Sequence, residues 1–486
     1  RSTVRFYLFL NLKEARNWTC SQALNLIRRD LLTVMRVFCY LALSEKLFKR
    51  TLDPQYSRKH FSRRSRSIYR AEEEKIEELE DASSKRKPRS RVFAMGLAVH
   101  GALGQPELLY QADPHFKLKE YMHKPMKIGF GVLNNVKGVA CGYDFTLFYT
   151  PKHKISIIHG TGINTDSQIG VFKSKTAKNL ETIISPQPIK LSCMSNDATV
   201  LCLSAGRAHA AVATNEGTFL WGNNSLGQCG RPIIRDEDYF SNQHFTKINI
   251  AEKVSKVVCG QDHSIFLTSS GKLYSCGWGA DGQTGQGHYK NSWEPCPVVG
   301  DVEKEIIVKV AAKGDFCLAL NDKGEIFGWG NNEYNQLSCI TGKSQLHTSK
   351  HLKFSHVGRV IDIAASATMA LVLNEKGQVF VWGFGCLGNG NKAEFSSTAV
   401  EIPLTLFGRN EITPEARVVK IAAGLNHLCA INSQGSLFTW GKNTFGCLGL
   451  GNTNLQLFPL RVSIPCIVKD VSCGIHHTLA IGLPVI

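Results

Sequence analysis

Gly324-Glu-Ile-Phe-Gly-Trp-Gly330 and Gly377-Gln-Val-Phe-Val-Trp-Gly383 are two copies of one phrase, in which a glycine leads a short apolar run into Trp-Gly. Five such copies follow one another at intervals of roughly 50 to 60 residues, a period typical of repeat architectures. Five of the seven tryptophans in the chain stand in this phrase. We expect them to form the core of the repeat: Trp221, Trp278, Trp329, Trp382 and Trp440.

A second motif precedes each phrase. It consists of an aliphatic residue, two small residues, usually glycine, two variable residues and often histidine, as in Val257-Val-Cys-Gly-Gln-Asp-His263. It occurs seven times, at 139–145, 203–209, 257–263, 310–316, 363–369, 421–427 and 471–477. The Trp-Gly half also occurs seven times once two degraded copies, 91–104 and 155–170, are included.

The order of the halves predicts a closed ring. The first Trp-Gly half (91–104) has no partner before it, and the last Gly-x-x-His half (467–482) has none after it. One repeat is therefore split between the two ends of the propeller sequence, and its strands complete a single sheet when the ring closes. Short apolar runs separated by turn residues are typical of strands. Four strands in each of seven units predict an all-β fold, a seven-bladed β-propeller over residues 91–486.

These motifs resemble the regulator-of-chromosome-condensation repeat family over residues 91–482. The segment from Val258 to Tyr289 is similar to a mitochondrial branch of that family. The resemblance implies a guanine-nucleotide exchange factor, which needs no bond chemistry of its own. In the mitochondrial branch the implied partner is a dynamin-like fusion GTPase. The founding member acts partly through a protruding β-wedge, for which residues 231–250 and 389–417 offer the only room.

The first ninety residues are strongly basic. They carry a net charge of +10 out of the +17 of the whole chain. We expect residues 1–34, which precede the first methionine, to be an untranslated or non-native leader. Residues 35–70 are basic, contain serine and are poor in acids, as in a mitochondrial transit peptide, and 71–90 form a charged linker. The predicted location is the mitochondrial matrix or inner-membrane face, although Lys85-Arg-Lys-Pro-Arg89 also fits a nuclear import signal.

The sixteen cysteines predict neither a disulfide scaffold nor a metal site. The chain contains no Cys-x-x-Cys and no His/Cys group at zinc-ligand spacing. Cys141, Cys259 and Cys473 fill one repeat position where other copies carry alanine, which indicates small buried side chains in a reducing compartment. We therefore expect no metal.

Enzyme chemistry is not expected either. Gly277-x-Gly279-x-x-Gly282 and Gly383-x-Gly385-x-x-Gly388 match a dinucleotide fingerprint as strings, but no strand–helix–strand unit surrounds them. No nucleophile with an adjacent base is evident, so we expect no cofactor and no bond chemistry.

Polar residues in the repeated turns are the candidates for partner binding, because loops on a rigid scaffold collect binding residues. The competing interpretations are structural. The Asp and Gln side chains would cap their own turns, and the repeated histidines would hydrogen-bond backbone near a central channel. The candidates are Arg207, His209, Gln261, Asp262, His263, Asp281 and Gln283.

Two other functions remain open. The mitochondrial relative is also linked to ribosomal-RNA stability and mitoribosome assembly, so the chain could serve as a scaffold for RNA-modifying enzymes. The third hypothesis is a nuclear exchange factor for a Ran-type GTPase. We expect a monomer that reaches the inner membrane only through its partner. Salt-dependent RNA association or GDP release from a matrix GTPase would separate these hypotheses.

Overall fold

The computed structural model describes residues 89–485 except 109–118, 153–154, 175–176, 192–194, 196–197, 338–341 and 391–393. These residues belong to one compact unit, Arg70–Ile486. The expected leader, the transit peptide and nearly all of the charged linker lie outside the described residues. No helix within the described part of the chain is long and apolar enough to cross a membrane.

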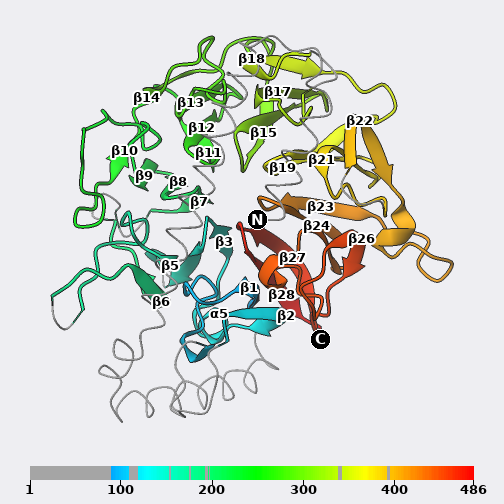
Figure 1. Ribbon diagram of the computed structural model, residues 1–486, viewed down its shortest axis with the longest axis horizontal. Coiled ribbons are helices and arrows are strands. Elements are labelled where there is room, and N and C mark those ends of the chain that lie inside the picture. The colour runs from blue at the N-terminus through cyan, green and yellow to red at the C-terminus, as the bar shows by residue number, and fades with distance from the viewer. Residues whose placement is uncertain are drawn as a thin grey trace, which may run out of the picture. The chain divides into compact units, whose positions relative to one another are not determined.

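Seven four-stranded antiparallel sheets surround a central axis, with the first strand of each blade nearest the centre (Figure 1). Blade 1 contains β27 (Cys466–Cys473), β28 (His477–Pro484), β1 (Arg91–Leu97) and β2 (Tyr121–Lys127). Blade 2 contains β3 (Gly138–Cys141), β4 (Phe145–Lys152), β5 (Ile155–Ile163) and β6 (Thr182–Pro188). Blade 3 contains β7 (Val200–Ala205), β8 (His209–Thr214), β9 (Gly217–Gly222) and β10 (Thr246–Lys247).

The remaining four blades follow in chain order. Blade 4 contains β11 (Val254–Cys259), β12 (His263–Thr268), β13 (Leu273–Gly277) and β14 (Ser292–Pro297). Blade 5 contains β15 (Ile307–Ala312), β16 (Phe316–Asn321), β17 (Ile326–Asn331) and β18 (Gln345–Leu352). Blade 6 contains β19 (Val360–Ala365), β20 (Met369–Asn374), β21 (Val379–Gly385) and β22 (Glu394–Ile402). Blade 7 contains β23 (Val418–Ala423), β24 (His427–Asn432), β25 (Leu437–Gly441) and β26 (Gln456–Arg461). The short helices are η3 (Pro106–Leu108), α5 (Gly129–Asn134), η4 (Leu404–Phe407) and η5 (Thr444–Gly446).

The ring closes within blade 1. Strand β1 pairs with β28 in antiparallel register from Arg91 opposite Gly482 to Gly96 opposite His477. The two ends of the propeller sequence thus share one sheet and leave neither half unpaired. This confirms both the seven-bladed fold and the closure between the terminal strands.

Four tryptophans fill equivalent positions between neighbouring blades. Trp221, Trp329, Trp382 and Trp440 are fully buried. The indole Nε1–H of Trp329 also donates to the carbonyl of Gln283 in the preceding blade, at 2.9 Å. Each indole therefore joins two blades through apolar area and, in this case, a hydrogen bond.

The expectation for Trp278 is wrong. It is only half-buried, and Cys276 occupies the tryptophan position of blade 4, opposite Ser264. The reason is register: the buried position directly precedes the glycine that pairs with the motif histidine. In blade 4 that glycine is Gly277, opposite His263, so the buried position is Cys276 rather than the tryptophan. Met95 and Thr161 occupy the same position in blades 1 and 2, opposite Thr478 and Thr146.

The Gly-x-x-His motif places an imidazole directly on a glycine. A Cβ added to Gly260 would lie 2.1 Å from Cε1 of His263, so a larger residue does not fit there. Blades 5 and 6 have neither the glycine nor the histidine of this motif. Blade 5 carries Lys313 and Phe316 at the two positions, and blade 6 carries Ser366 and Met369.

Each repeated histidine reaches the next blade rather than backbone, which corrects the expected hydrogen-bond partner. Nε2 of His209 contacts Ser264 Oγ at 3.1 Å, and the same nitrogen of His263, His427 and His477 contacts Cys317, Thr478 and Thr146. Burial lowers the pKa of His209, His263 and His477 to about 3, so these rings are neutral clamps between blades. His427 differs: burial alone would lower its pKa, but Cys447 and Cys473 raise it to about 10.

Candidate partner-binding face

One end of the ring carries two sets of connections. Because the strands alternate in direction, the turn between the first and second strands and the loop between the third and fourth strands leave each blade at the same end. We call this end the inner-turn face. Backbone hydrogen bonds join its neighbouring turns, as from Arg207 N–H to the Gln261 carbonyl (3.0 Å) and from Gln261 N–H to the Gly314 carbonyl (3.3 Å). Neighbouring turns of this face are thus joined to one another rather than standing as separate loops.

An ion pair joins blades 3 and 4 on this face. The Arg207 guanidinium donates from Nε to Asp262 Oδ1 at 3.0 Å, and its Nη2 lies 2.8 Å from Oδ2. Burial is the largest single influence and lowers the pKa of Arg207, but the charge and hydrogen bond of Asp262, together with the charges of Tyr143 and Asp315, raise that pKa overall, so the cation persists. The Asp262 side chain is 7% exposed and that of Arg207 is 43% exposed, so Arg207 is the partner that presents surface to solvent.

Next to this pair is a second group of carboxylates. Gln345 Nε2 donates to Asp281 Oδ1 at 2.7 Å, and Gln283 Nε2 lies 3.4 Å from Asp315 Oδ1. Burial and the charges of Asp262 and Asp281 raise the pKa of Asp315 to about 7. The centre of blades 3 to 5 therefore holds three carboxylates against one arginine.

The structure thus brings together five of the seven candidates: Arg207, Gln261, Asp262, Asp281 and Gln283. Gln261 joins the network by accepting a hydrogen bond from Tyr143 Oη at 3.1 Å. Gln283 is fully buried, and its Oε1 accepts from Asp281 N–H at 3.0 Å, so it holds the turn, as in the turn-capping alternative.

His209 and His263 are not surface residues. Both are fully buried beneath the turns, where they clamp adjacent blades. They were candidates for direct partner contact, and the structure corrects this because no partner atom can reach them without opening the ring.

A further carboxylate was missed from sequence. Asp144 is buried at the junction of blades 1 and 2, 3.4 Å from His100 Nδ1 and 3.7 Å from His476 Nδ1. Burial would raise its pKa, but His100 and His476 hold it well below the usual range. A signal was available, since Asp144 occupies the same motif position as Asp262 and Asp315. Its two histidines stand at opposite ends of the propeller sequence and could not have been paired by spacing.

Exposed aromatic side chains of blades 4 to 6 lie on the outer part of the inner-turn face. Phe384 stacks on Tyr334 with ring centroids 5.8 Å apart, and Tyr289 meets His347 edge-on at 4.7 Å. Tyr289, Trp293 and Phe395 are 43%, 42% and 54% exposed. Aromatic residues and arginine are the types enriched at the anchors of protein interfaces.

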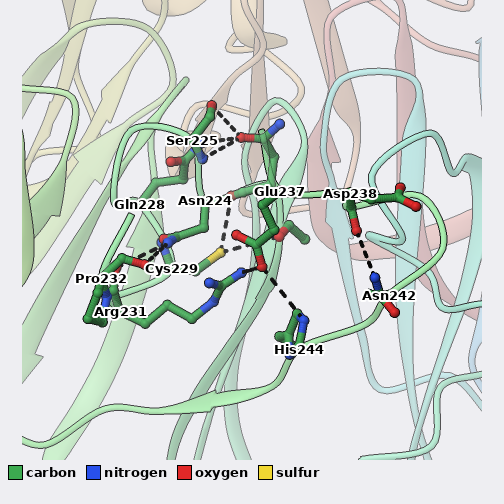
Figure 2. A network of polar contacts seen from close by, with 12 residues as sticks. Asn224, Ser225, Gln228, Cys229, Arg231, Pro232, Glu237, Asp238, Asn242 and His244 are labelled. Atoms are coloured by element: carbon green, nitrogen blue, oxygen red, sulfur yellow. Dashed lines mark hydrogen bonds and ion pairs between the residues drawn. The ribbon is translucent and has the colours of Figure 1, made fainter. Parts of the chain in front are cut away.

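The long loop between β9 and β10 lies on the same face and is fixed by its own polar contacts (Figure 2). Glu237 accepts from Arg231 Nη2 at 2.5 Å and lies 3.6 Å from His244 Nε2. Asn224 Nδ2 donates to the Arg231 carbonyl at 3.0 Å. The loop exposes Ile233 and Ile234, which are 43% and 57% exposed.

Neither stretch with room for a wedge contains an inserted hairpin among its described residues. The loop part of 231–250 has no strand until β10. The stretch 389–417 contains the outer strand β22 and η4, and then connects to β23 at the opposite end of the ring. Of these two stretches, 231–250 is therefore the one whose long described loop lies on the inner-turn face.

Comparison with known proteins gives the family. The chain matches the RCC1-like domain over residues 252–482 and the regulator of chromosome condensation (RCC1) repeat over 90–149 and 216–267. It is 40% identical over 442 residues to the mouse RCC1-like G exchanging factor-like protein, covering 88% of this chain and 96% of the mouse protein. The human protein of the same name is 41% identical over 401 residues, 81% of this chain and 86% of that protein.

Solved structures agree. The crystal structure of human WBSCR16 superposes with a TM-score of 0.76 at 40% identity, over 82% of this chain and all of that one. This confirms the resemblance of residues 258–289 to the condensation-regulator-like protein of the Williams–Beuren region. The structure of Prp20p from Saccharomyces cerevisiae, at 18% identity and a TM-score of 0.66 over 82% and 93% of the two chains, shares the fold. The chain therefore belongs to the regulator of chromosome condensation (RCC1) repeat family, and its relatives are exchange-factor-like propellers.

Proposed function

We propose that this protein is a guanine-nucleotide exchange factor that acts through its inner-turn face on a mitochondrial dynamin-like fusion GTPase. The observation that carries the proposal is the acidic centre of Arg207, Asp262, Asp281 and Asp315, together with the exposed aromatic residues of blades 4 to 6 on the same face. The names of the 40% identical relatives support the activity class. Prp20p, which shares the fold, is described by its binding to Gsp1p and histones.

Exchange requires only differential binding. A protein that binds the nucleotide-free GTPase more tightly than the GDP-bound form lowers the affinity for GDP by the same factor. GTPases hold the phosphates with a lysine, backbone N–H groups and Mg²⁺. Carboxylates such as Asp281 and Asp315 are complementary to these cationic groups and would compete with phosphate for them.

The charge of the inner-turn face favours a protein partner over RNA. Four carboxylates (Asp144, Asp262, Asp281 and Asp315) lie in or beside its central turns, whereas an RNA-binding surface needs cations and stacking rings along the phosphate path. If the protein were a scaffold for ribosomal RNA, it would therefore have to use another surface. The test below includes an outcome that would favour this scaffold function.

The test is GDP release. A mitochondrial dynamin-like fusion GTPase and, separately, a Ran-type GTPase are loaded with a fluorescent GDP analogue, and the full chain is added with excess unlabelled GTP. We expect a dose-dependent increase of at least about tenfold in the release rate for the dynamin-like GTPase, equivalent to about 1.4 kcal/mol of differential binding.

Two other results would contradict the proposal. Acceleration for the Ran-type GTPase alone would assign the protein to a nuclear partner. Acceleration for neither, together with salt-sensitive crosslinking to ribosomal RNA in isolated mitochondria, would favour the scaffold function.

A further inference from the structure

A thiol pair lies between blades 7 and 1, away from the inner-turn residues described above. Sγ of Cys429 on β24 is 3.3 Å from Sγ of Cys473 at the end of β27. One ring nitrogen of His427 joins them, and the three ligand atoms all lie within 4.8 Å of one another. All three residues are buried, with 0%, 3% and 0% exposure for Cys429, Cys473 and His427.

This arrangement occurs at one blade junction among the described residues. The position of Cys429 is two residues after the motif histidine, and the other blades carry an aliphatic residue there: Leu147, Ala211, Ile265, Leu318, Leu371 and Leu479. Cys141 and Cys259 share the position of Cys473, but neither faces a thiol from the Cys429 position. A repeat-wide packing role therefore does not account for the pair.

A third thiol lies beside this group of three residues. Cys447 follows β25 in a turn position where blades 2 to 5 have glutamine, and it interacts with His427. Its Sγ is also 3.3 Å from the Lys442 carbonyl. His427 Nε2 is 2.8 Å from Thr478 Oγ1, the kind of outer contact that orients a ligating imidazole.

The chemical type of these ligands indicates which metal ion the site would bind. Thiolate and imidazole together favour Zn²⁺ over hard cations such as Mg²⁺ or Ca²⁺, and closed four-ligand sites of Cys and His are typical of structural zinc. The buried ammonium of Lys313 lies near enough to Cys473 for their charges to interact, and it offsets the negative charge that three thiolates would place around one Zn²⁺.

We propose that His427, Cys429 and Cys473 bind Zn²⁺ and that the ion fastens blade 7 to blade 1. The thiol of Cys447 would turn from the Lys442 carbonyl toward the ion to become the fourth ligand. The apolar cluster at this junction has Met95 where four other blades have tryptophan, so it buries less aromatic surface. A metal ion there stabilises the junction that joins the last complete blade to the split one.

The sequence predicts no metal, and the three residues of this group could not be recognised from it. His427 and Cys429 are two residues apart, but Cys473 is 44 residues from Cys429 and lies on the next blade. Ligand spacing within one loop, the usual sequence signal for zinc, is therefore missing.

The test is the metal content of the full chain. Protein produced in zinc-supplemented medium and dialysed against metal-free buffer should retain about one equivalent of zinc, measured by inductively coupled plasma mass spectrometry. Cys429→Ser and Cys473→Ser should reduce this to background. Cys259→Ser, at the position of Cys473 in blade 4, is the matched control and should retain the metal.

A second readout uses the wild-type chain and does not depend on the folding of a variant. Replacement of zinc by Co²⁺ should give thiolate-to-cobalt charge-transfer absorption and the intense visible bands of a tetrahedral site. Absence of metal from folded wild-type protein, or its retention in Cys429→Ser, would overturn the proposal. So would a Cys429–Cys473 disulfide in peptides mapped without reductant, which would make the pair a redox site.

Discussion

The guanidinium of Arg207 in blade 3 and the carboxylate of Asp262 in blade 4 form a two-contact ion pair, at 3.0 Å and 2.8 Å, across the boundary between the two blades. Asp262 is nearly buried, so its charge is tolerated because Arg207 is present. The pair couples two turns of the same face and orients the Arg207 surface that a partner would meet.

The first prediction concerns the strength of this coupling. The loss of stability in the double variant Arg207→Met/Asp262→Leu should be smaller than the sum of the losses in Arg207→Met and Asp262→Leu. The reason is that Arg207→Met alone takes the arginine away from a buried carboxylate. The expected coupling is about 1 kcal/mol, since Arg207 is partly solvated. Denaturant unfolding of the two single variants and the double variant measures it, and additive effects would show that the pair is incidental.

The second prediction separates two tryptophans with the same sequence context. Trp329→Ala should lower the free energy of unfolding by about 3 to 5 kcal/mol, because it empties a fully buried site between blades 4 and 5. Trp278→Ala should cost about 1 kcal/mol or less, since its partly buried ring lies outside the blade core. Equal losses in thermal or denaturant unfolding would contradict the register described for blade 4.

Trp329 and Trp278 show which parts of the fold can be predicted from the sequence and which cannot. Repetition reveals the number of blades, the split blade and the core position, because every copy samples the same geometry. It misassigned Trp278, because an extra Trp-Gly after Gly277 resembles the repeated phrase while the strand register selects Cys276.

The candidate site was also predicted only in part from the sequence. Motif position brought Asp262 and Asp281 to the correct face, but it could not distinguish the buried His263 from the half-buried Gln261 beside it. Contacts between distant parts of the chain, such as Asp144 with His100 and His476, or Cys429 with Cys473, depend on which blades adjoin. Spacing within one repeat does not encode them.

The third prediction tests the glycine beneath the histidine. Gly260→Ala should destabilise the propeller by about 1 to 3 kcal/mol, because the new Cβ meets the His263 ring at 2.1 Å. The double variant Gly260→Ser/His263→Met copies Ser366 and Met369 of blade 6 and should recover part of the loss. Melting temperatures of the three proteins provide the measurement, and a tolerated Gly260→Ala would refute the steric argument.

The fourth prediction is a pH dependence. Burial and the neighbouring charges of Asp262 and Asp281 raise the folded-state pKa of Asp315 to about 7, from an ordinary value of 3.8. The folded state therefore binds this proton more tightly than the unfolded state does, and the free energy of unfolding falls as the pH rises from about 4 to about 7. Asp315→Asn should remove this part of the slope and stabilise the protein at pH 8 by about 1 kcal/mol. A slope unchanged by the substitution would mean that Asp315 ionises normally.

In the proposed function, the inner-turn face acts on the GTPase and the opposite end of the ring does not. The measurement is the rate of GDP release from the dynamin-like fusion GTPase with the wild-type chain, with Asp281→Lys and with Glu375→Lys. Glu375 is an exposed acid in the turn between β20 and β21, at the opposite end of the ring, and gives the same change of charge. We expect Asp281→Lys to abolish most of the acceleration and Glu375→Lys to retain it, with both variants folded. Full acceleration by Asp281→Lys, or its loss only in Glu375→Lys, would exclude the inner-turn face as the surface that acts on the GTPase.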